Sequence, residues 1–190
     1  MPKRGNQNSK ETDPLPALAQ AVYSLKMCAM ANDSATHACA AWLQTHDSNP
    51  RTATGHAAAI LAHARAFLAT FARDVAVVFT GSGAAATAAR VADLERDEGL
   101  KLRLSRTIDV DSFRARYAAI RAYGTRPVEY LARLRAAEEA VVKEQAMVAQ
   151  MHALAALLES TQRDVLEMQP FLAQLLAIEE TAPRKRTKNI

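Results

Sequence analysis

The chain has 190 residues, enough for one domain with its own core or for an elongated bundle that depends on neighbours. Alanine makes up about a fifth of the residues and aromatic residues only 5%, so the core per residue is thin and long, narrow helix packing is favoured. The formal charge of +4 comes from cations near the two ends, and the near-neutral middle argues against nucleic-acid binding as the main role.

The first predicted helix follows a polar, charged segment over residues 1–13, which predicts a disordered N-terminal arm. An apolar stripe then recurs at steps of three and four, formed by Leu15, Leu18, Val22, Leu25 and Ala29. This spacing predicts a helix to about Leu43. Turn-forming residues over 45–50 should end it, and Thr54 can cap the next helix.

The second predicted helix has the most clearly buried stripe, formed by Leu61, Ala64, Leu68, Phe71, Val75 and Val78. The sequence Thr80-Gly81-Ser82-Gly83 should break or bend it. Helix then resumes over 84–98, and Gly99 should end it. Residues 14–99 are therefore expected to form a helical hairpin region.

A basic connector with one short helix is predicted over 100–126. Residues 100–104 alternate with period two, but an isolated strand has no evident partner, so a loop or irregular helix is expected. Asp109 or Asp111 can cap a helix that ends at Gly124 and carries Phe113, Tyr117 and Ile120. The arginine-rich block over 101–135 and the acidic block over 138–180 can attract each other or two different partners.

The longest predicted element is a coiled-coil helix over 127–181, with Pro127 in its first turn. Its seam consists of Met151, Leu154, Leu158, Thr161, Val165, Met168, Leu172 and Leu175. A skipped residue before this seam should distort the supercoil locally, and Pro170 should kink the helix or start a new one. Residues 182–190 should form a basic, disordered tail.

Residues with catalytic or metal-binding chemistry do not form a recognisable motif. His56 and His63 are about 10 Å apart on one helix face, too far to hold one metal without other ligands. Cys28 and Cys39 are about 16 Å apart on one helix, beyond disulfide reach, and are expected to be buried thiols. Residues 80–83 lack the lysine of a phosphate loop, and 109–111 lack the further ligands of a calcium loop. No enzymatic activity, cofactor or metal is therefore expected.

Partner-binding positions are predicted on the two apolar stripes. They are Leu61, Leu68, Phe71, Val75, Val78, Met151, Leu154, Leu158, Val165, Met168, Leu172 and Leu175. The basic tail is a second candidate, because clustered cations bind acidic lipids, acidic polymers or phosphates. Its residues are Arg184, Lys185, Arg186 and Lys188, and a merely solubilising role is equally open.

The segment 166–180 resembles the C-terminal helical signature of subunit 2 of the biogenesis of lysosome-related organelles complex 1. The matching positions are Gln169, Pro170, Phe171, Leu172, Gln174 and Ile178-Glu179-Glu180. A weaker similarity covers Phe79-Thr80-Gly81 followed by Leu94-Glu95. The resemblance implies a small coiled-coil subunit of a hetero-oligomeric rod, peripheral to endosomal or lysosomal membranes and without catalytic residues.

The sequence thus predicts an all-α, elongated bundle of helical hairpins with a long C-terminal coiled-coil helix. No stretch approaches ~18 uninterrupted apolar residues and no signal-peptide core follows the start, so a cytoplasmic protein without transmembrane insertion is expected. The leading hypothesis is a non-enzymatic scaffold subunit whose partners are other coiled-coil proteins. The alternatives are a cytoskeletal or kinetochore-type coiled coil whose tail binds an acidic polymer such as a microtubule or nucleic acid, and a self-assembling helical structural protein.

Overall fold

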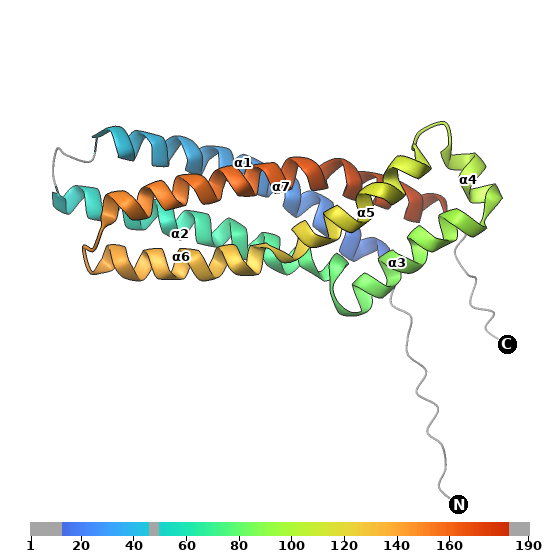
Figure 1. Cartoon of the computed structure of the whole chain (residues 1–190), viewed down its shortest axis with the longest axis horizontal. Coiled ribbons are helices and arrows are strands. Elements are labelled where there is room, and N and C mark those ends of the chain that lie inside the picture. Colours follow the sequence, from blue (N-terminus) through green and yellow to red (C-terminus); the bar gives the residue numbers. More distant parts are fainter. Residues whose placement is uncertain (1–12, 46–49, 183–190) are drawn as a thin grey trace, which may run out of the picture.

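The computed structural model describes residues 13–45 and 50–182, and these form helices without any strand. The helices are α1 (Leu15–Thr45), α2 (Pro50–Asp74), the 3₁₀ turn η2 (Ala76–Phe79), α3 (Gly81–Arg96), α4 (Glu98–Leu104), α5 (Val110–Thr125), α6 (Pro127–Val142) and α7 (Met147–Thr181). The predicted all-α class and elongated bundle are confirmed (Figure 1). The arm over 1–12, the turn over 46–49 and the tail over 183–190 lie outside the described residues.

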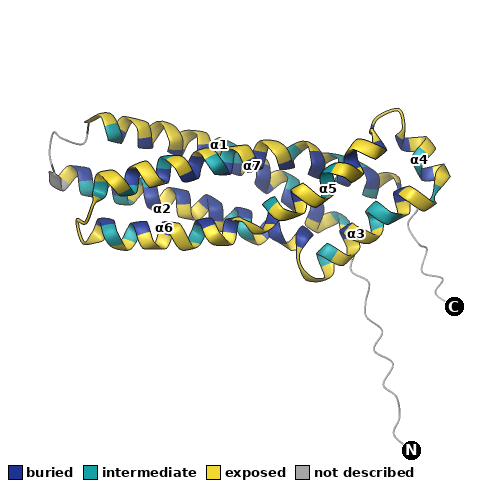
Figure 2. Cartoon of the chain, viewed as in Figure 1, coloured by how far each residue is buried: buried dark blue, intermediate teal, exposed yellow. Residues whose placement is uncertain are grey.

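Helices α1, α2, α6 and α7 form an up-and-down bundle. The neighbours around the ring are α1–α2, α2–α6, α6–α7 and α7–α1 (Figure 1). Buried positions on α1 repeat in steps of three and four from Leu18 to Trp42, the pattern of a helix with one side in a bundle core. Buried residues follow the inner sides of all four helices and exposed residues the outer sides (Figure 2).

Beyond the end of α2 at Asp74, the elements η2, α3, α4 and α5 build the other end of the molecule (Figure 1). The predicted bend at residues 80–83 is confirmed, since the segments 52–79 and 81–96 meet at 51°. Thr80 is extended and Gly81 has a φ of +52°, a value that favours glycine. Gly83 lies so close to the Val77 carbonyl that a Cβ there would clash with it.

Three aromatic rings gather in this end around Phe171 of α7. Phe113 of α5 stacks on it with ring centroids 4.4 Å apart and planes 1° apart, while Phe79 and Tyr117 lie 6.5 and 6.1 Å away. Gly124 lies against the Phe79 ring, where a Cβ would overlap it. Three distant segments of the chain therefore build one aromatic core on α7.

Several predicted boundaries over residues 50–104 are wrong. Thr54 does not cap α2, because α2 begins at Pro50 and Thr54 lies inside it. Gly99 does not end a helix either: α3 stops at Arg96, and Asp97 caps α4 by accepting from the Leu100 backbone N–H at 2.9 Å. Residues 100–104 are α-helical, because Leu100 and Leu104, four apart, bury one side while Leu102 stays 74% exposed.

The prediction for α5 is confirmed at its start, where Asp109 accepts from the Ser112 backbone N–H at 3.2 Å. The helix ends one residue beyond Gly124, at Thr125, and Pro127 opens α6 as predicted.

The single helix predicted over 127–181 is wrong, because the chain turns back over residues 143–146. Glu144 and Ala146 have φ values of +54° and +48°, which costs roughly 1–2 kcal/mol each for non-glycine residues. The turn is favoured nevertheless, because it lets the apolar side of α7 pack against α1 instead of extending past the start of α2. No supercoil runs through the skipped residue before the seam, because most of the earlier stripe lies on α6 and the seam lies on α7. Helix α7 continues through Pro170, so no new helix starts there.

Candidate interaction surface

The apolar stripes predicted to bind partners form the core of this chain's own bundle. Each of the twelve predicted residues is at most 6% exposed. They are Leu61, Leu68, Phe71, Val75, Val78, Met151, Leu154, Leu158, Val165, Met168, Leu172 and Leu175. The periodicity identified buried positions correctly but could not tell which chain buries them. In this fold they offer no surface to a partner, and a charged residue at Leu158 would disrupt folding before it disrupted assembly.

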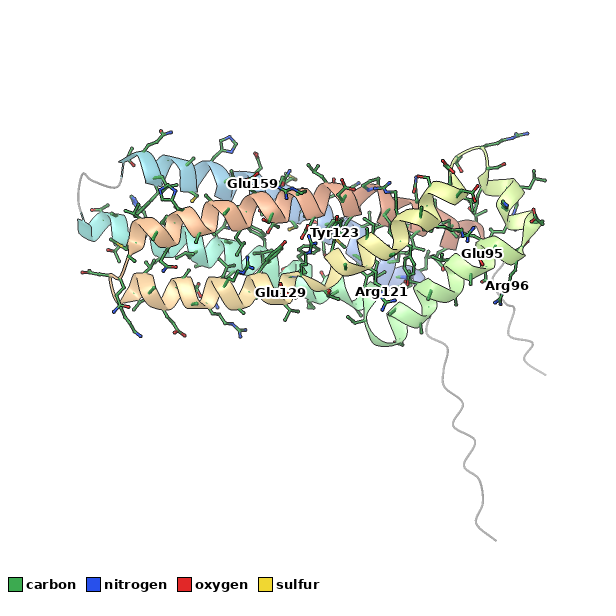
Figure 3. The ribbon with its side chains drawn as sticks, in the orientation of Figure 1. Glu95, Arg96, Arg121, Tyr123, Glu129 and Glu159 are labelled. Carbon is green, nitrogen blue, oxygen red and sulfur yellow. The ribbon has the colours of Figure 1, made fainter. Side chains whose placement is uncertain are left out.

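A buried polar cluster ties α7 to the junction between α5 and α6. The Asp164 carboxylate accepts from Arg126 Nη1 at 2.8 Å and from the Tyr130 hydroxyl at 2.6 Å, and its side chain is only 2% exposed. Burial, together with the bond to Asp164, raises the pKa of Tyr130 to about 12. The Arg126 guanidinium also lies 4.3 Å from the Tyr123 ring centroid. Tyr123, Arg121 and Glu129 gather where α5 gives way to α6 (Figure 3).

A second buried carboxylate fixes the end of α2 against α1. Asp74 accepts from Arg73 Nε at 2.6 Å, from the Ser24 hydroxyl at 2.5 Å and from Gln20 Nε2 at 3.2 Å. Arg73 contributes most to lowering the pKa of Asp74 to about 2, and Ser24 and Gln20 lower it further against the effect of burial. Every partner of Asp74 and Asp164 is a side chain of this chain, so both clusters join helices.

The basic and acidic blocks of the sequence do attract each other. Arg126 pairs with Asp164, and Arg116 Nη2 lies 3.6 Å from Glu167 Oε2, so α7 and the connector are joined by charge. Arg90 of α3 binds Glu179 through two bonds of 2.7 and 3.0 Å. The tail residues proposed for acidic partners, Arg184, Lys185, Arg186 and Lys188, lie outside the described residues.

The cysteines, histidines and acidic residues are dispersed. Cys28 and Cys39 are buried free thiols as predicted; burial raises the pKa of Cys28 to about 12, and Cys39 donates to the Met151 carbonyl at 3.3 Å. Within residues 13–45 and 50–182, no three His, Cys, Asp or Glu side chains lie close enough to hold a metal ion.

The surface that differs from the rest is the outer face of α1. Tyr23, Met27 and Met30 are 59%, 45% and 69% exposed and follow one another at steps of four and three, so they share one side of the helix. That side is opposite the buried repeat of α1. We call these three residues the α1 outer stripe. Sequence analysis missed it because the inner stripe of the same helix had already accounted for the helical period.

A shallow hollow of about 380 Å³ between α1 and α7 lies on the Val22 side of this stripe. Its walls are Val22, Leu25, Lys26, Gln169, Pro170 and Ala173. Leu166, 57% exposed, lies one turn before Pro170 on α7. The apolar surface thus extends from the α1 outer stripe toward α7.

Comparisons of the chain with protein families, with curated proteins and with solved structures each gave no match. Among the described residues, no single helix is long and apolar enough to cross a membrane; the bent pair 52–79 and 81–96 meets that test by length and composition only.

Proposed function

We propose that this chain is a non-enzymatic helical scaffold that binds other helical proteins through the outer face of its bundle. One observation carries the proposal: three large apolar side chains, Tyr23, Met27 and Met30, lie exposed in register on one helix. Scattered exposed apolar residues are ordinary, but an aligned group beside an open hollow is typical of an interaction site. Methionine suits such a site, because its flexible side chain adapts to a partner.

The polar groups of the core favour the same class of function. The buried carboxylates Asp74 and Asp164 are bound by side chains of neighbouring helices, and neither lines the hollow between α1 and α7. An acid used in catalysis must reach a bound substrate, whereas these two hold helices in register.

The test is purification of the tagged chain from its native cells, with quantitative mass spectrometry at moderate salt. The comparison is between the unaltered chain, Met30→Glu on the α1 outer stripe and Val142→Glu as the matched control. Val142 is 75% exposed at the far end of α6, so its substitution changes the charge equally without touching α1. We expect helical partners that are lost with Met30→Glu and kept with Val142→Glu. Equal recovery with both variants would contradict the proposed surface.

The identity of what is recovered decides between the open functional settings. Several small coiled-coil subunits would support the endosomal and lysosomal setting implied by the resemblance in residues 166–180. Tubulin or nucleic acid, lost when residues 184–190 are removed and insensitive to Met30→Glu, would favour the tail-driven alternative. Recovery of the chain alone would favour a self-assembling structural protein.

A further inference from the structure

The outer face of α1 carries charges as well as apolar side chains. Lys26 and Asp33 are seven residues apart, two turns along α1, and both are exposed on the same side of the helix, next to the α1 outer stripe. Lys26 makes no ion pair within residues 13–45 and 50–182. The Asp33 carboxylate oxygen Oδ1 lies 3.6 Å from Nδ1 of His37, and both side chains are more than 70% exposed. Neither charge is therefore used by the fold.

These two charges make the face complementary to itself in one orientation. A two-fold axis midway between positions 26 and 33 passes between Ala29 and Met30. Antiparallel pairing about this axis places Lys26 of each copy opposite Asp33 of the other, which gives two equivalent ion pairs. Parallel pairing instead places Lys26 against Lys26 and Asp33 against Asp33, which is unfavourable.

The same axis brings the apolar residues together. The two Met30 side chains flank it, and Met27 lies within one helical turn of Met30 of the second copy. Leu166 and the hollow beside Lys26 lie on the α7 flank of this contact, where they add apolar surface. A two-fold contact of this kind uses one patch on both copies, as most homodimers do.

We infer that the partner of the α1 outer stripe is a second copy of this chain, paired antiparallel through α1 about an axis between residues 29 and 30. This inference rests on the proposed function and adds that one of the helical proteins bound by the α1 outer stripe is a second copy of the chain. Helix α1 is about 46 Å long, so a contact along its outer face falls at the small end of specific interfaces. Self-association in the micromolar range is the expected strength.

Charge exchange tests the pairing. Sedimentation equilibrium of the full chain at low salt is expected to show a monomer–dimer equilibrium. Lys26→Asp alone and Asp33→Lys alone should each weaken it about tenfold, and the two together should restore it. Because both side chains are exposed, circular dichroism should show all three variants folded. A monomer at every concentration, or a double variant as weak as the single ones, would overturn the inference.

Cysteine cross-linking tests the orientation independently. Under mild oxidation, Met30→Cys should form a disulfide-linked dimer, because the two residues flank the axis. Tyr23→Cys should not, because antiparallel pairing separates the two copies of residue 23 by about 13 residues, or ~20 Å. Linking of both variants would indicate parallel pairing and overturn the inference. Failure of self-association leaves the proposed scaffold role standing if the recovery of helical partners still depends on Met30.

Discussion

The two ends of the bundle are stabilised in different ways. The end formed by α1, α2, α6 and α7 relies on repetition, with small core residues such as Ala35, Ala57 and Ala64 that let long helices approach closely. The end formed by η2, α3, α4 and α5 relies on Phe171 and the rings around it, with aspartate caps at Asp97 and Asp109. Many weak, similar contacts stabilise the first, and a few large ones the second.

The largest expected effect comes from removing the centre of the aromatic end. Phe171→Ala should lower the free energy of unfolding by about 3–5 kcal/mol, since the ring is fully buried and contacts three others. Hydrogen exchange should increase first in peptides of α5, before those of the four-helix end. Val148→Ala, an exposed position on the same helix, is the control and should change stability by less than about 0.5 kcal/mol. Uniform loosening of both ends would show that they unfold as one unit.

Two glycine substitutions compare the packing of the aromatic end with that of the four-helix end. Gly124→Ala should destabilise by about 1–3 kcal/mol, because the added methyl group meets the Phe79 ring. Gly55→Ala in α2 has open space around the new methyl group and should stabilise by about 0.5–1 kcal/mol through helix propensity. Urea unfolding of both variants measures the two changes in the free energy of unfolding. The same sign for both would mean that packing at Gly124 can adjust to the methyl group.

The junction between the two ends should respond to acid through Asp74. Its folded pKa of about 2 lies below the ordinary value of 3.8, so the native state favours the carboxylate. The resulting stabilisation is fully present above about pH 4 and is lost as the pH falls through 2. Asp74→Asn should cost about 1–2 kcal/mol at pH 7, reduced by solvent screening on the Arg73 side, and almost nothing near pH 2. Unfolding at a series of pH values checks this, with exposed Asp33→Asn as the control.

The smallest expected change in stability is that of Ala146→Gly, and its sign reports on the turn over residues 143–146. Ala146→Gly should stabilise by about 1 kcal/mol, because Ala146 has a left-handed backbone that glycine adopts without strain. In one continuous helix over 127–181, the same substitution would destabilise by about 1 kcal/mol. Thermal unfolding therefore decides between a hairpin and an uninterrupted coiled coil at this point.

The sequence predicted well wherever a feature depended on local spacing. The stripes of α2 and α7, the Asp109 cap, Pro127 at a helix start and the bend at residues 80–83 all follow from neighbouring residues. The turn at 143–146 was not predictable, because it contains no glycine or proline and depends on where α1 lies. The aromatic cluster was missed for a related reason: Phe79, Phe113 and Phe171 meet only after the chain has folded.

The apolar stripes predicted to bind partners are buried in this chain's own bundle, and the reason is a third one. A periodic apolar stripe predicts which side of a helix is buried. In a chain with several such stripes, they can pack against one another and leave none for a partner. The α1 outer stripe was visible as Tyr23, Met27 and Met30 at helical spacing, but only the fold shows that nothing in residues 13–45 and 50–182 covers it. For a multi-helix chain, a second stripe on a helix that already has one is the better indicator of a binding surface.

The pairing of the first long helix with the last governs how this chain can fold. Asn32 of α1 donates to the Leu158 carbonyl of α7 across 126 positions, and Cys39 meets Met151 across 112. The α1–α2 and α6–α7 hairpins can form early from nearby residues, whereas the inner face of α1 must wait until α7 has left the ribosome. We therefore expect docking of the two hairpins to be the slow step of folding, and a chain truncated before α7 should expose the apolar side of α1 and aggregate.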